Sequence, residues 1–586
     1  MNEPKQLVSL VNNGKLNKHL PEGTPFGLVG TSSLYKRESY PNGVVRPDSV
    51  TSVYSGGNDP WRGLDAFTSH GNGISLNLHN QGGDIGLYEN KDIHAIRILA
   101  MEPTTDRKGG ANSGRRFYNH SSERLRILGE FPIRKFGTRA AGVSEMVNGQ
   151  PKDPDGQPDT SFLAKIPADT AFTLQTLDVR GMVLNTSQTW HQLRPGELRA
   201  DCGGCHAHSQ KPTDFNLTLA AKPGYEVWDL VNNTPLLTTK GNDTSKQKWD
   251  IAGTGGLRQV KKTDGQGIIS PEYLRDIQPI LQRSCVVCHS KQFDKPAGQL
   301  VLDADDEQIQ NEQHGKFPGT YYRLALDERA KFGHKPIGYD SWGYPNASRY
   351  IRKQASRRSL LVWKIFGERL DGFSNDDHPS ESEPGSGFYT HKGQKVPTDK
   401  SRHRYDLDFT GSEMPPAAAI AGKAKNPAGD VVTVPPLSDE ERFTLLRWID
   451  LGCPIDLDTA KTDLARLGYG WRLDDNRPVL ALTEPRPNAN PQFDRILVGM
   501  HDYYSGLDPA SFTVTANFEV AGLKAGENLA AKFKPKSQGV WELKLPKPIT
   551  QLSNAKLIVS VKDKQGNWTR IERDFSVGKP AQTAQR

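Results

Sequence analysis

Two short cysteine motifs constrain this chain of 586 residues more strongly than any other feature of its sequence. Four of its five cysteines fall in two Cys-x-x-Cys-His motifs, and Cys453 stands alone. This pattern is the attachment signature of c-type haem, in which two thiols bind the porphyrin and the adjacent histidine is an axial ligand of the iron. The sequence therefore predicts two covalently bound haems, held by Cys202, Cys205 and His206 and by Cys285, Cys288 and His289.

Other uses of the cysteines fit the pattern less well. Zinc also takes pairs of cysteines as ligands, but the histidine directly after each pair argues for haem. A disulfide framework would need an even set at wider spacings.

Length, composition and charge narrow the class of protein. A chain this long exceeds one hydrophobic core, so three or four domains are expected. Its 56 glycines and 40 prolines favour turns and short strands over long helices. A net charge of +7 is small for this length and argues against the concentrated basic surface of a nucleic-acid binder.

The expected location follows from the haem motifs. No apolar run reaches the roughly 20 residues of a membrane span, so no transmembrane segment is expected. The first residues, Met1–Lys5, lack the features of a signal peptide. Because haem c is attached outside the cytoplasm, we expect a periplasmic or extracellular protein whose signal has been removed, or part of a longer chain.

Sequence patterns divide the chain into four expected parts. Residues 1–90 are polar and lack periodicity, which indicates an irregular segment. Residues 91–268 contain β-type segments such as Ile93–Leu99 and resemble a transthyretin-like sandwich that ends in the first haem motif. Residues 269–480 are expected to form an α-helical cytochrome c domain. After a Pro/Asn-rich linker at Glu484–Pro491, residues 492–578 alternate as in an immunoglobulin-like β-sandwich.

Three helices are expected around the second motif. The run Ser270-Pro271-Glu272 predicts the start of a helix that leads into Cys285, with Pro279 as a point where it kinks. A second helix is expected at Ser359–Leu370. A third begins at Ser438 with acidic residues in its first turn and ends at Gly452.

Met414 is the predicted sixth ligand of the second haem. It precedes two prolines on a loop before the last of these helices, the place of the distal methionine in cytochromes c, where a thioether raises the reduction potential. His378 and His403 are the competing ligands, and Met414 as a core residue is the remaining alternative.

The first haem has no evident sixth ligand. His191, His208, His120 and His94 are all candidates, and each is equally compatible with a surface or structural role. A haem without a strong distal ligand is open to a small molecule, so any catalysis is expected here.

The chain resembles a known family over roughly residues 90–455. The residues that carry the resemblance are Ile166–Thr170, Leu177, Asp178, Trp190, Arg194–Glu197 and Cys202–His206. They are similar to the middle domain of the hydrazine synthase alpha subunit. The segments Asp276–Leu281, Met414–Pro416 and Trp448–Asp450 are similar to cytochrome domains of environmental bacteria.

The resemblance implies a periplasmic multihaem protein whose first haem is catalytic. The family's N-terminal β-propeller has no counterpart repeat in this sequence. In the family, a tyrosine four positions after the motif histidine binds the iron and the histidine itself helps to hold zinc. This chain has Gln210 at that position. Another iron ligand, or a division of iron and zinc between His206 and His208, is the resulting alternative.

Three functions remain open from the sequence. The leading hypothesis is a dihaem cytochrome that transfers electrons to other redox proteins or cytochrome subunits. The second is a haem enzyme acting on a small nitrogen or peroxide substrate at the first haem, and the third is a scaffold subunit of a cytochrome complex.

The acidic stretch His501–Asp508 is a candidate calcium site, with an ordinary turn as the alternative.

Overall fold

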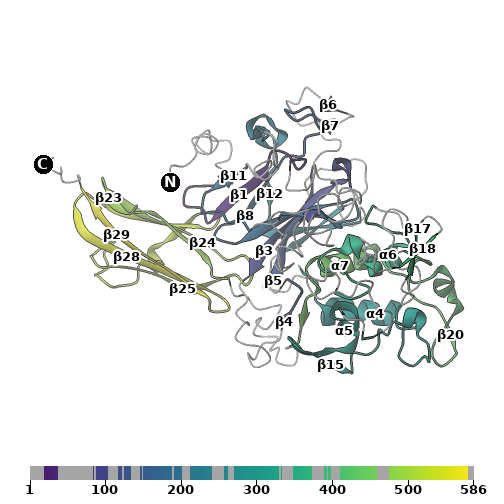
Figure 1. The fold of residues 1–586 in the computed structure, drawn as a ribbon. Coiled ribbons are helices and arrows are strands. Elements are labelled where there is room, and N and C mark those ends of the chain that lie inside the picture. Colours follow the sequence, from purple (N-terminus) through teal and green to yellow (C-terminus); the bar gives the residue numbers. More distant parts are fainter. Residues whose placement is uncertain are drawn as a thin grey trace.

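The computed structural model describes most of the chain after residue 18. The described residues are 19–36, 83–84, 88–102, 117–121, 124–133, 146–147, 150–187, 190–200, 212–239, 256–261, 270–328, 331–332, 347–372, 388–391, 394–397, 409–457, 474 and 476–578. Strands dominate, and the helices are few and short. The sheets of the N-terminal half lie between an elongated C-terminal β arm on one side and the helices on the other (Figure 1).

Two sheets form the N-terminal β part. One has the order β11 (Leu198–Arg199), β1 (Phe26–Thr31), β8 (Phe162–Pro167) and β12 (Trp228–Asp229). The other has the order β2 (Gly83–Asp84), β10 (Val183–Thr186), β9 (Phe172–Leu177), β3 (Ala95–Glu102) and β5 (Arg124–Pro132). One apolar cluster contains residues of both sheets, including Val29, Ile96 and Phe162. The β-strands expected from residue 91 onward are confirmed.

Strand β1 was missed by the sequence reasoning, which expected only irregular structure in residues 1–90. It pairs antiparallel with β8, Phe26 opposite Pro167 and Thr31 opposite Phe162. Gly30 explains both the strand and the failure to predict it. A Cβ at this position would lie 2.3 Å from the Phe162 carbonyl oxygen, so the two backbones approach as only glycine allows. The glycines interrupt the alternation that would have marked a strand.

Several two-stranded sheets complete the first two thirds of the chain. They are β13 (Asn233–Thr238) with β14 (Gly256–Lys261), β15 (Gln308–Asn311) with β16 (Gly315–Pro318), β17 (Phe388–His391) with β18 (Gln394–Pro397), β19 (Ala424–Lys425) with β20 (Val431–Val432), β6 (Met146–Val147) with β7 (Gln150–Pro151), and β21 (Ile455–Asp456) with β4 (Phe117–Tyr118). The last of these joins the helical part to the β part, since Ile455 pairs with Tyr118.

The helical part contains α4 (Gln278–Ser284), α5 (Gly319–Ala325), α6 (Leu360–Phe366) and α7 (Asp439–Asp450) around one apolar core. The expected helices at 359–370 and 438–452 are thereby confirmed, although α6 is shorter than expected. Ser438 caps α7 by accepting from the Glu441 amide, and the Glu441 side chain returns a bond to the Ser438 amide. Helix α6 ends at Gly367, whose φ of +73° is a left-handed conformation.

The helix that leads to the second motif starts differently from the prediction. The capping residue is Glu272, not Ser270, because its carboxylate accepts from the amides of Leu274 and Arg275. A π-helical turn, η7 (Tyr273–Ile277), precedes α4. Pro279 lies in the first turn of α4, where the missing amide hydrogen costs no helical bond. The irregular turn therefore lies before Pro279 and not at it.

Two four-stranded sheets form the C-terminal arm. Their orders are β22 (Val479–Glu484), β24 (Phe493–His501), β27 (Val540–Ile549) and β26 (Lys534–Ser537), and β23 (Asn488–Asn490), β29 (Trp568–Val577), β28 (Leu552–Asp563) and β25 (Leu507–Ala516). The two sheets enclose one apolar cluster. The prediction of a linker at Glu484–Pro491 is wrong. Strand β22 ends at Glu484 and β23 pairs with β29, so these residues belong to the two sheets.

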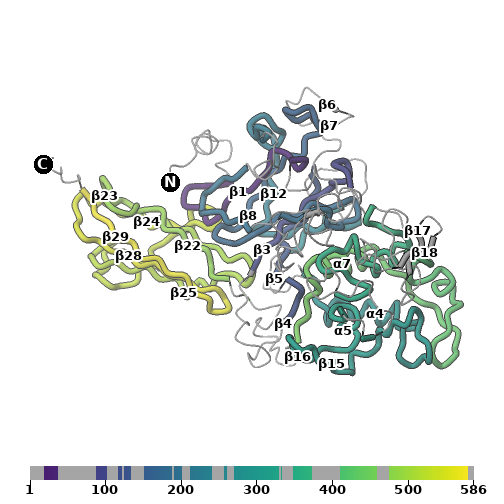
Figure 2. Tube along the Cα trace, viewed as in Figure 1, coloured from purple at the N-terminus to yellow at the C-terminus, as the bar shows by residue number. Residues whose placement is uncertain are grey.

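The N-terminal segment anchors this arm. Glu22 forms ion pairs with Arg495 and Lys536, at 2.6 Å and 3.1 Å, and the Gly23 carbonyl lies against Gly499. Figure 2 shows this neighbourhood, with β1 and β8 of the central part beside β22 and β24 of the arm. The described residues include no helix long and apolar enough to cross a membrane.

A buried charge cluster joins the β part to α7. Glu130 on β5 pairs with Arg97 at 2.8 Å and with Arg447 at 2.7 Å. Arg97 also reaches Asp450 at 3.3 Å, and Asp450 accepts from the Ser356 amide at 2.9 Å. All four charged side chains are at most 4% exposed. Burial by itself would raise the pKa of Glu130, but the charges of Arg447 and Arg97 outweigh it and hold this pKa well below its usual range.

Removing Glu130 should therefore destabilise the protein strongly. The change Glu130→Ala leaves two guanidinium groups buried without their shared carboxylate, and breaking such a pair costs ~3–5 kcal/mol. Chemical denaturation followed by tryptophan fluorescence measures the loss, with Glu130→Gln as a milder variant. The control is Glu368→Ala, which removes the partner of Arg180 from a half-exposed ion pair and should cost less than ~1 kcal/mol. Equal effects of Glu130→Ala and the control would contradict this account.

The protonation of the buried Glu272 makes the protein less stable as the pH rises. Burial raises its pKa to about 7 from a model-compound value of 4.5. The folded state thus binds the proton more tightly than the unfolded chain, so its contribution is complete below pH 4.5 and is lost as pH rises through 7. We expect Glu272→Gln, which stays neutral, to flatten the decrease in stability between pH 5 and 8. Thermal denaturation across that range is the measurement, and a slope equal to that of the unchanged protein would refute it.

Candidate haem site

The second motif continues helix α4 as a turn. The Cys285 amide bonds to the Leu281 carbonyl at 2.9 Å, and the amides of Cys288 and His289 bond back to the Cys285 carbonyl at 3.2 Å and 3.1 Å. Both cysteines are free thiols of intermediate burial. The local hydrogen bonds thus place the two thiols and the imidazole on consecutive turns of one short segment, the arrangement that haem attachment needs.

His289 has the surroundings of a neutral imidazole. Burial lowers its pKa, nearby backbone groups of Ala297 and Leu300 oppose the shift, and the positive charge of Lys364 adds to it. The carbonyl of His289 accepts from the Leu302 amide at 2.7 Å and fixes its backbone. Its Nδ1 atom is buried without a hydrogen-bond partner among the described residues. A buried neutral imidazole with an open nitrogen fits an iron ligand.

The thiol of Cys285 is protected in the protein chain itself. Burial raises its pKa to about 12. A protonated, half-buried thiol is a poor nucleophile in thiol–disulfide exchange.

The Met414 loop, residues 409–416, is fixed by two helices. The Met414 amide donates to the Lys364 carbonyl on α6 at 2.7 Å. Glu413 forms an ion pair with Arg442 on α7 at 2.8 Å. Gly367, at the end of α6, lies so close that a Cβ there would be 2.9 Å from the Glu413 Cβ. These contacts hold the half-buried Met414 in the same helical part as the motif.

A small apolar cluster brings the motif and the segment after Met414 together. Val287, between the two cysteines, packs against a cluster of Ala419, Ala424 and Val434. Arg283 on α4 also pairs with Glu441 on α7. These contacts place the motif that follows α4 and the loop that carries Met414 in the same helical part. Thiol, imidazole and thioether groups are the kinds of side chain that hold a haem c.

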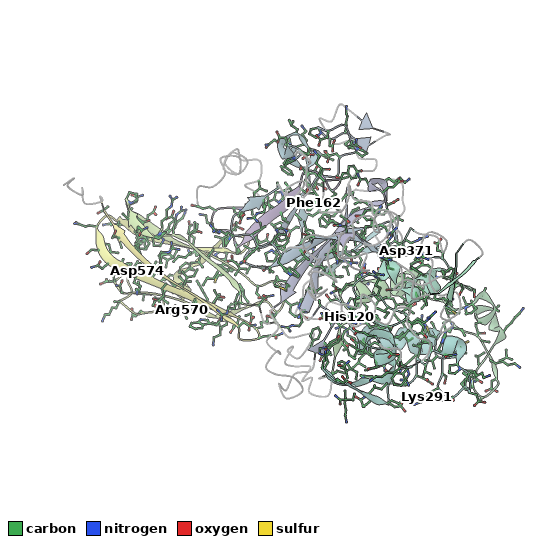
Figure 3. All side chains as sticks on the ribbon, viewed as in Figure 1. His120, Phe162, Lys291, Asp371, Arg570 and Asp574 are labelled. Carbon is green, nitrogen blue, oxygen red and sulfur yellow. The ribbon has the colours of Figure 1, made fainter. Side chains whose placement is uncertain are left out.

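The two cations that flank the second motif in the sequence, Arg283 and Lys291, are already paired with carboxylates. Besides the Arg283–Glu441 pair, Lys291 bonds to Asp306 at 2.6 Å and is labelled in Figure 3. Their charges are therefore already paired, and these contacts do not orient either residue towards a haem propionate.

The residues of the first motif, Cys202, Cys205 and His206, lie outside the described residues, as do His208 and Gln210. The same holds for His378 and His403, the alternative ligands of the second haem. Strand β11 leads towards the first motif and pairs in parallel with β1, Leu198 opposite Leu28. The chain thus approaches this motif along a sheet and not along a helix.

The other candidate ligands of the first haem occupy three different places. His191 forms an isolated bridge with Phe172, and its ring lies 5.7 Å from the Phe172 ring. His120 is buried where the helices meet the β part (Figure 3), and its Nε2 lies 2.7 Å from the Ala325 carbonyl. Burial lowers the pKa of His120 to about 3. His94 lines a cavity described below.

The acidic stretch proposed for calcium folds into a buried cluster. Asp502 lies with Asp474 and Asp563, their carboxylate oxygens within 4.8 Å of one another. Backbone donors already occupy this cluster: Asp502 accepts from the Gly506 amide at 2.6 Å and Asp474 from the Ser505 amide at 3.0 Å. Asp474 was not recognised from the sequence because it lies 28 positions before Asp502. A calcium ion at this position stays a prediction.

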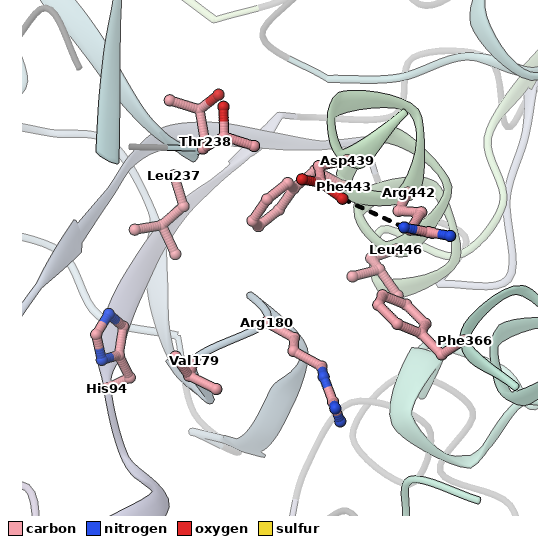
Figure 4. A pocket seen from close by; sticks show the side chains of 11 residues that line it. His94, Val179, Arg180, Leu237, Thr238, Phe366, Asp439, Arg442, Phe443 and Leu446 are labelled. Carbon is pink, nitrogen blue, oxygen red and sulfur yellow. Dashed lines mark hydrogen bonds and ion pairs between the residues drawn. The ribbon is translucent and has the colours of Figure 1, made fainter. Parts of the chain in front are cut away.

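Sequence reasoning also missed a cavity of about 330 Å³ between the β part and the helices (Figure 4). Its walls include His94 at the start of β3, Leu237 and Thr238 on β13, and Phe443 on α7. Arg180 and Arg442 both lie near the Phe366 ring, at 5.6 Å and 5.5 Å from its centre. The wall comes from five segments distant in sequence, so no local pattern could have marked it.

The fold and the site define a class: a β-rich protein of many sheets whose few helices assemble around a Cys-x-x-Cys-His motif. Residues 91–207 match the family model for the hydrazine synthase alpha subunit middle domain. The chain is 26% identical over 238 residues to hydrazine synthase subunit alpha of Kuenenia stuttgartiensis. Residues 91–207 are thus similar to the middle domain of the hydrazine synthase alpha subunit, which confirms the resemblance predicted from the sequence.

The comparisons extend over only part of these proteins. The alignment with subunit alpha covers 37% of this chain and 26% of the relative. The solved Kuenenia stuttgartiensis hydrazine synthase matches 74% of this chain and 44% of its own, at 16% identity and a TM-score of 0.37. CopC from Methylosinus trichosporium OB3b matches 18% of this chain, at 11% identity and a TM-score of 0.14.

The closeness of Gly367 to Glu413 gives a direct test of how the Met414 loop is fixed. Gly367→Ala places a Cβ in a left-handed backbone and 2.9 Å from the Glu413 Cβ, so the loop must move. We expect a loss of ~1 kcal/mol or more in stability. We also expect weaker methionine ligation in the optical spectrum. Gly429→Ala is the matched control: it has a φ of +88° but nothing within 4 Å of its added Cβ. Equal spectra for the two variants would contradict the account.

Proposed function

We propose that this chain is a dihaem c-type cytochrome that transfers single electrons as part of a larger redox assembly outside the cytoplasm. The observation that carries the proposal is the second site. There a Cys-x-x-Cys-His motif follows α4, and Cys285 and Phe409, the first residue of the Met414 loop, pack against the same apolar core. We further propose that this part, residues 269–480, is a cytochrome c domain and that the C-terminal sheets are immunoglobulin-like.

The haem supplies one-electron chemistry when it is bound, and the chain's own residues set its conditions. Cys285 and Cys288 would attach it, and the imidazole of His289, whose pKa is lowered by burial, would be one ligand. Met414 would be the second ligand, and its soft thioether favours reduced iron. Val286 packs against the apolar core that contains Leu281 and would give the haem an apolar contact. A site in which the protein supplies both ligands would suit electron transfer, because nothing has to bind or leave during turnover.

A second function is proposed for the first haem. The family model for the hydrazine synthase alpha middle domain ends at residue 207, so the match includes Cys202, Cys205 and His206. If the first haem lacks a strong distal ligand, it would act on a small nitrogen or peroxide substrate. A division of iron and zinc between His206 and His208 belongs to this alternative. In both proposals the partners are cytochrome subunits or other redox proteins.

Haem content and ligation test these proposals together. The matured protein should carry two haems by pyridine haemochrome assay and mass spectrometry. Cys285→Ala with Cys288→Ala, and separately Cys202→Ala with Cys205→Ala, should each remove one haem. Met414→His should lower the reduction potential of the second haem, because imidazole stabilises the oxidised iron relative to a thioether.

The spin state of the first haem then decides between the two functions. Optical and electron paramagnetic resonance spectra of the Cys285→Ala, Cys288→Ala variant report this haem alone. A low-spin, six-coordinate iron supports electron transfer, whereas a high-spin iron that binds carbon monoxide or nitric oxide supports the enzyme. A protein that carries no haem at either motif would end both proposals.

A further inference from the structure

Lys364 contacts the Met414 loop with both its backbone and its side chain. Its carbonyl accepts from the Met414 amide at 2.7 Å, and its ammonium group donates to the carbonyl of Thr410. The ammonium nitrogen also lies 5.3 Å from the centre of the Phe409 ring. One residue of α6 therefore holds both ends of the segment that carries the predicted sixth ligand.

The charge of Lys364 is not neutralised locally. Within the described parts of the chain it forms no ion pair with a carboxylate, and its partners are a carbonyl and an aromatic ring. The side chain is partly buried, which lowers the pKa of its ammonium group. A partly buried charge that has no carboxylate partner among the described residues acts more strongly on a neighbouring group than an exposed charge does.

Further contacts fix the side chain of Lys364 against the Met414 loop. Gly411, with a φ of +85°, would bring a Cβ to 3.2 Å from the Lys364 nitrogen, so the backbone closes over the ammonium group. Lys364 occupies the last turn of α6, where a cation is favourable to the helix dipole. The packed neighbours Trp363 and Ile365 are buried and fix the register of the helix.

We propose that Lys364 is the positioning residue of this haem site, which holds the Met414 loop in place and raises the reduction potential of the iron through its charge. The inference rests on the proposed function, since it requires a haem at Cys285–His289. Reduction adds one electron to the iron, so a nearby positive charge stabilises the reduced state more than the oxidised state. A firmly held methionine acts in the same direction.

The test compares three variants of the matured full chain by spectroelectrochemical titration. Lys364→Gln should lower the potential of the second haem and weaken the absorption band of methionine–iron ligation in the oxidised protein. Lys364→Arg keeps the charge and should keep the potential close to that of the unchanged protein. The control Lys423→Gln removes an exposed charge from the same helical part and should leave both quantities unchanged.

Two results would overturn the inference. Lys364→Gln with an unchanged potential and an unchanged ligation band would show that the residue neither positions nor tunes the site. Lys364→Arg with a potential as low as that of Lys364→Gln would exclude the charge as the cause. If Lys364→Gln does not fold, as judged by circular dichroism, Lys364→Met takes its place because it keeps the aliphatic stem. The proposed function fails differently, since the unchanged protein would then show no haem or no methionine band at this motif.

Discussion

The ion pairs of Glu130 with Arg97 and Arg447 determine how the two large parts of this molecule meet. Glu130 belongs to the β part, and Arg447 belongs to α7 of the helical part. Apolar packing alone would let two such surfaces slide, because it has little directional preference. Two guanidinium groups that share one buried carboxylate have a single good arrangement, since any displacement leaves a charge without its partner. The register of α7 against β5 is therefore set by charge geometry.

Helix α7 also contacts the candidate haem site, so its position against the β part affects that site. Its last turns carry Arg447 and Asp450, which face the β part, and its first turn carries Glu441 and Arg442. Glu441 binds Arg283 beside the second motif, and Arg442 binds Glu413 beside Met414. The helix has 12 residues, and at about 1.5 Å per residue it spans roughly 18 Å. One helix thus connects the five-stranded sheet of the β part with Arg283 beside the second motif and with the loop that carries Met414.

The parts of the structure that the sequence predicted are those with local signals. The capping box at Ser438, the alternation in β28 and β29, and the end of α4 at Cys285 each depend on residues within a few positions. The start of the helix before the motif was misplaced because Ser270 and Glu272 both resemble caps, and only the hydrogen bonds decide between them. Strand β1 was missed because the glycine that permits close pairing also removes the apolar alternation.

The tertiary contacts of the site had no such local signal. The motif predicts the haem ligands because attachment chemistry requires that spacing. The residues that fix Met414 come from elsewhere: Lys364 lies 50 positions before it and Arg442 lies 28 positions after it. Lys364 acts through its main-chain carbonyl and Arg442 through an ion pair. Any helix can provide such groups, so no sequence pattern predicts these contacts. A sequence thus predicts candidate ligands from their spacing, whereas the contacts that hold them follow from the packing of α6 and α7 around the loop. In the proposed cytochrome, the potential of the second haem would depend on that packing as much as on its two ligands.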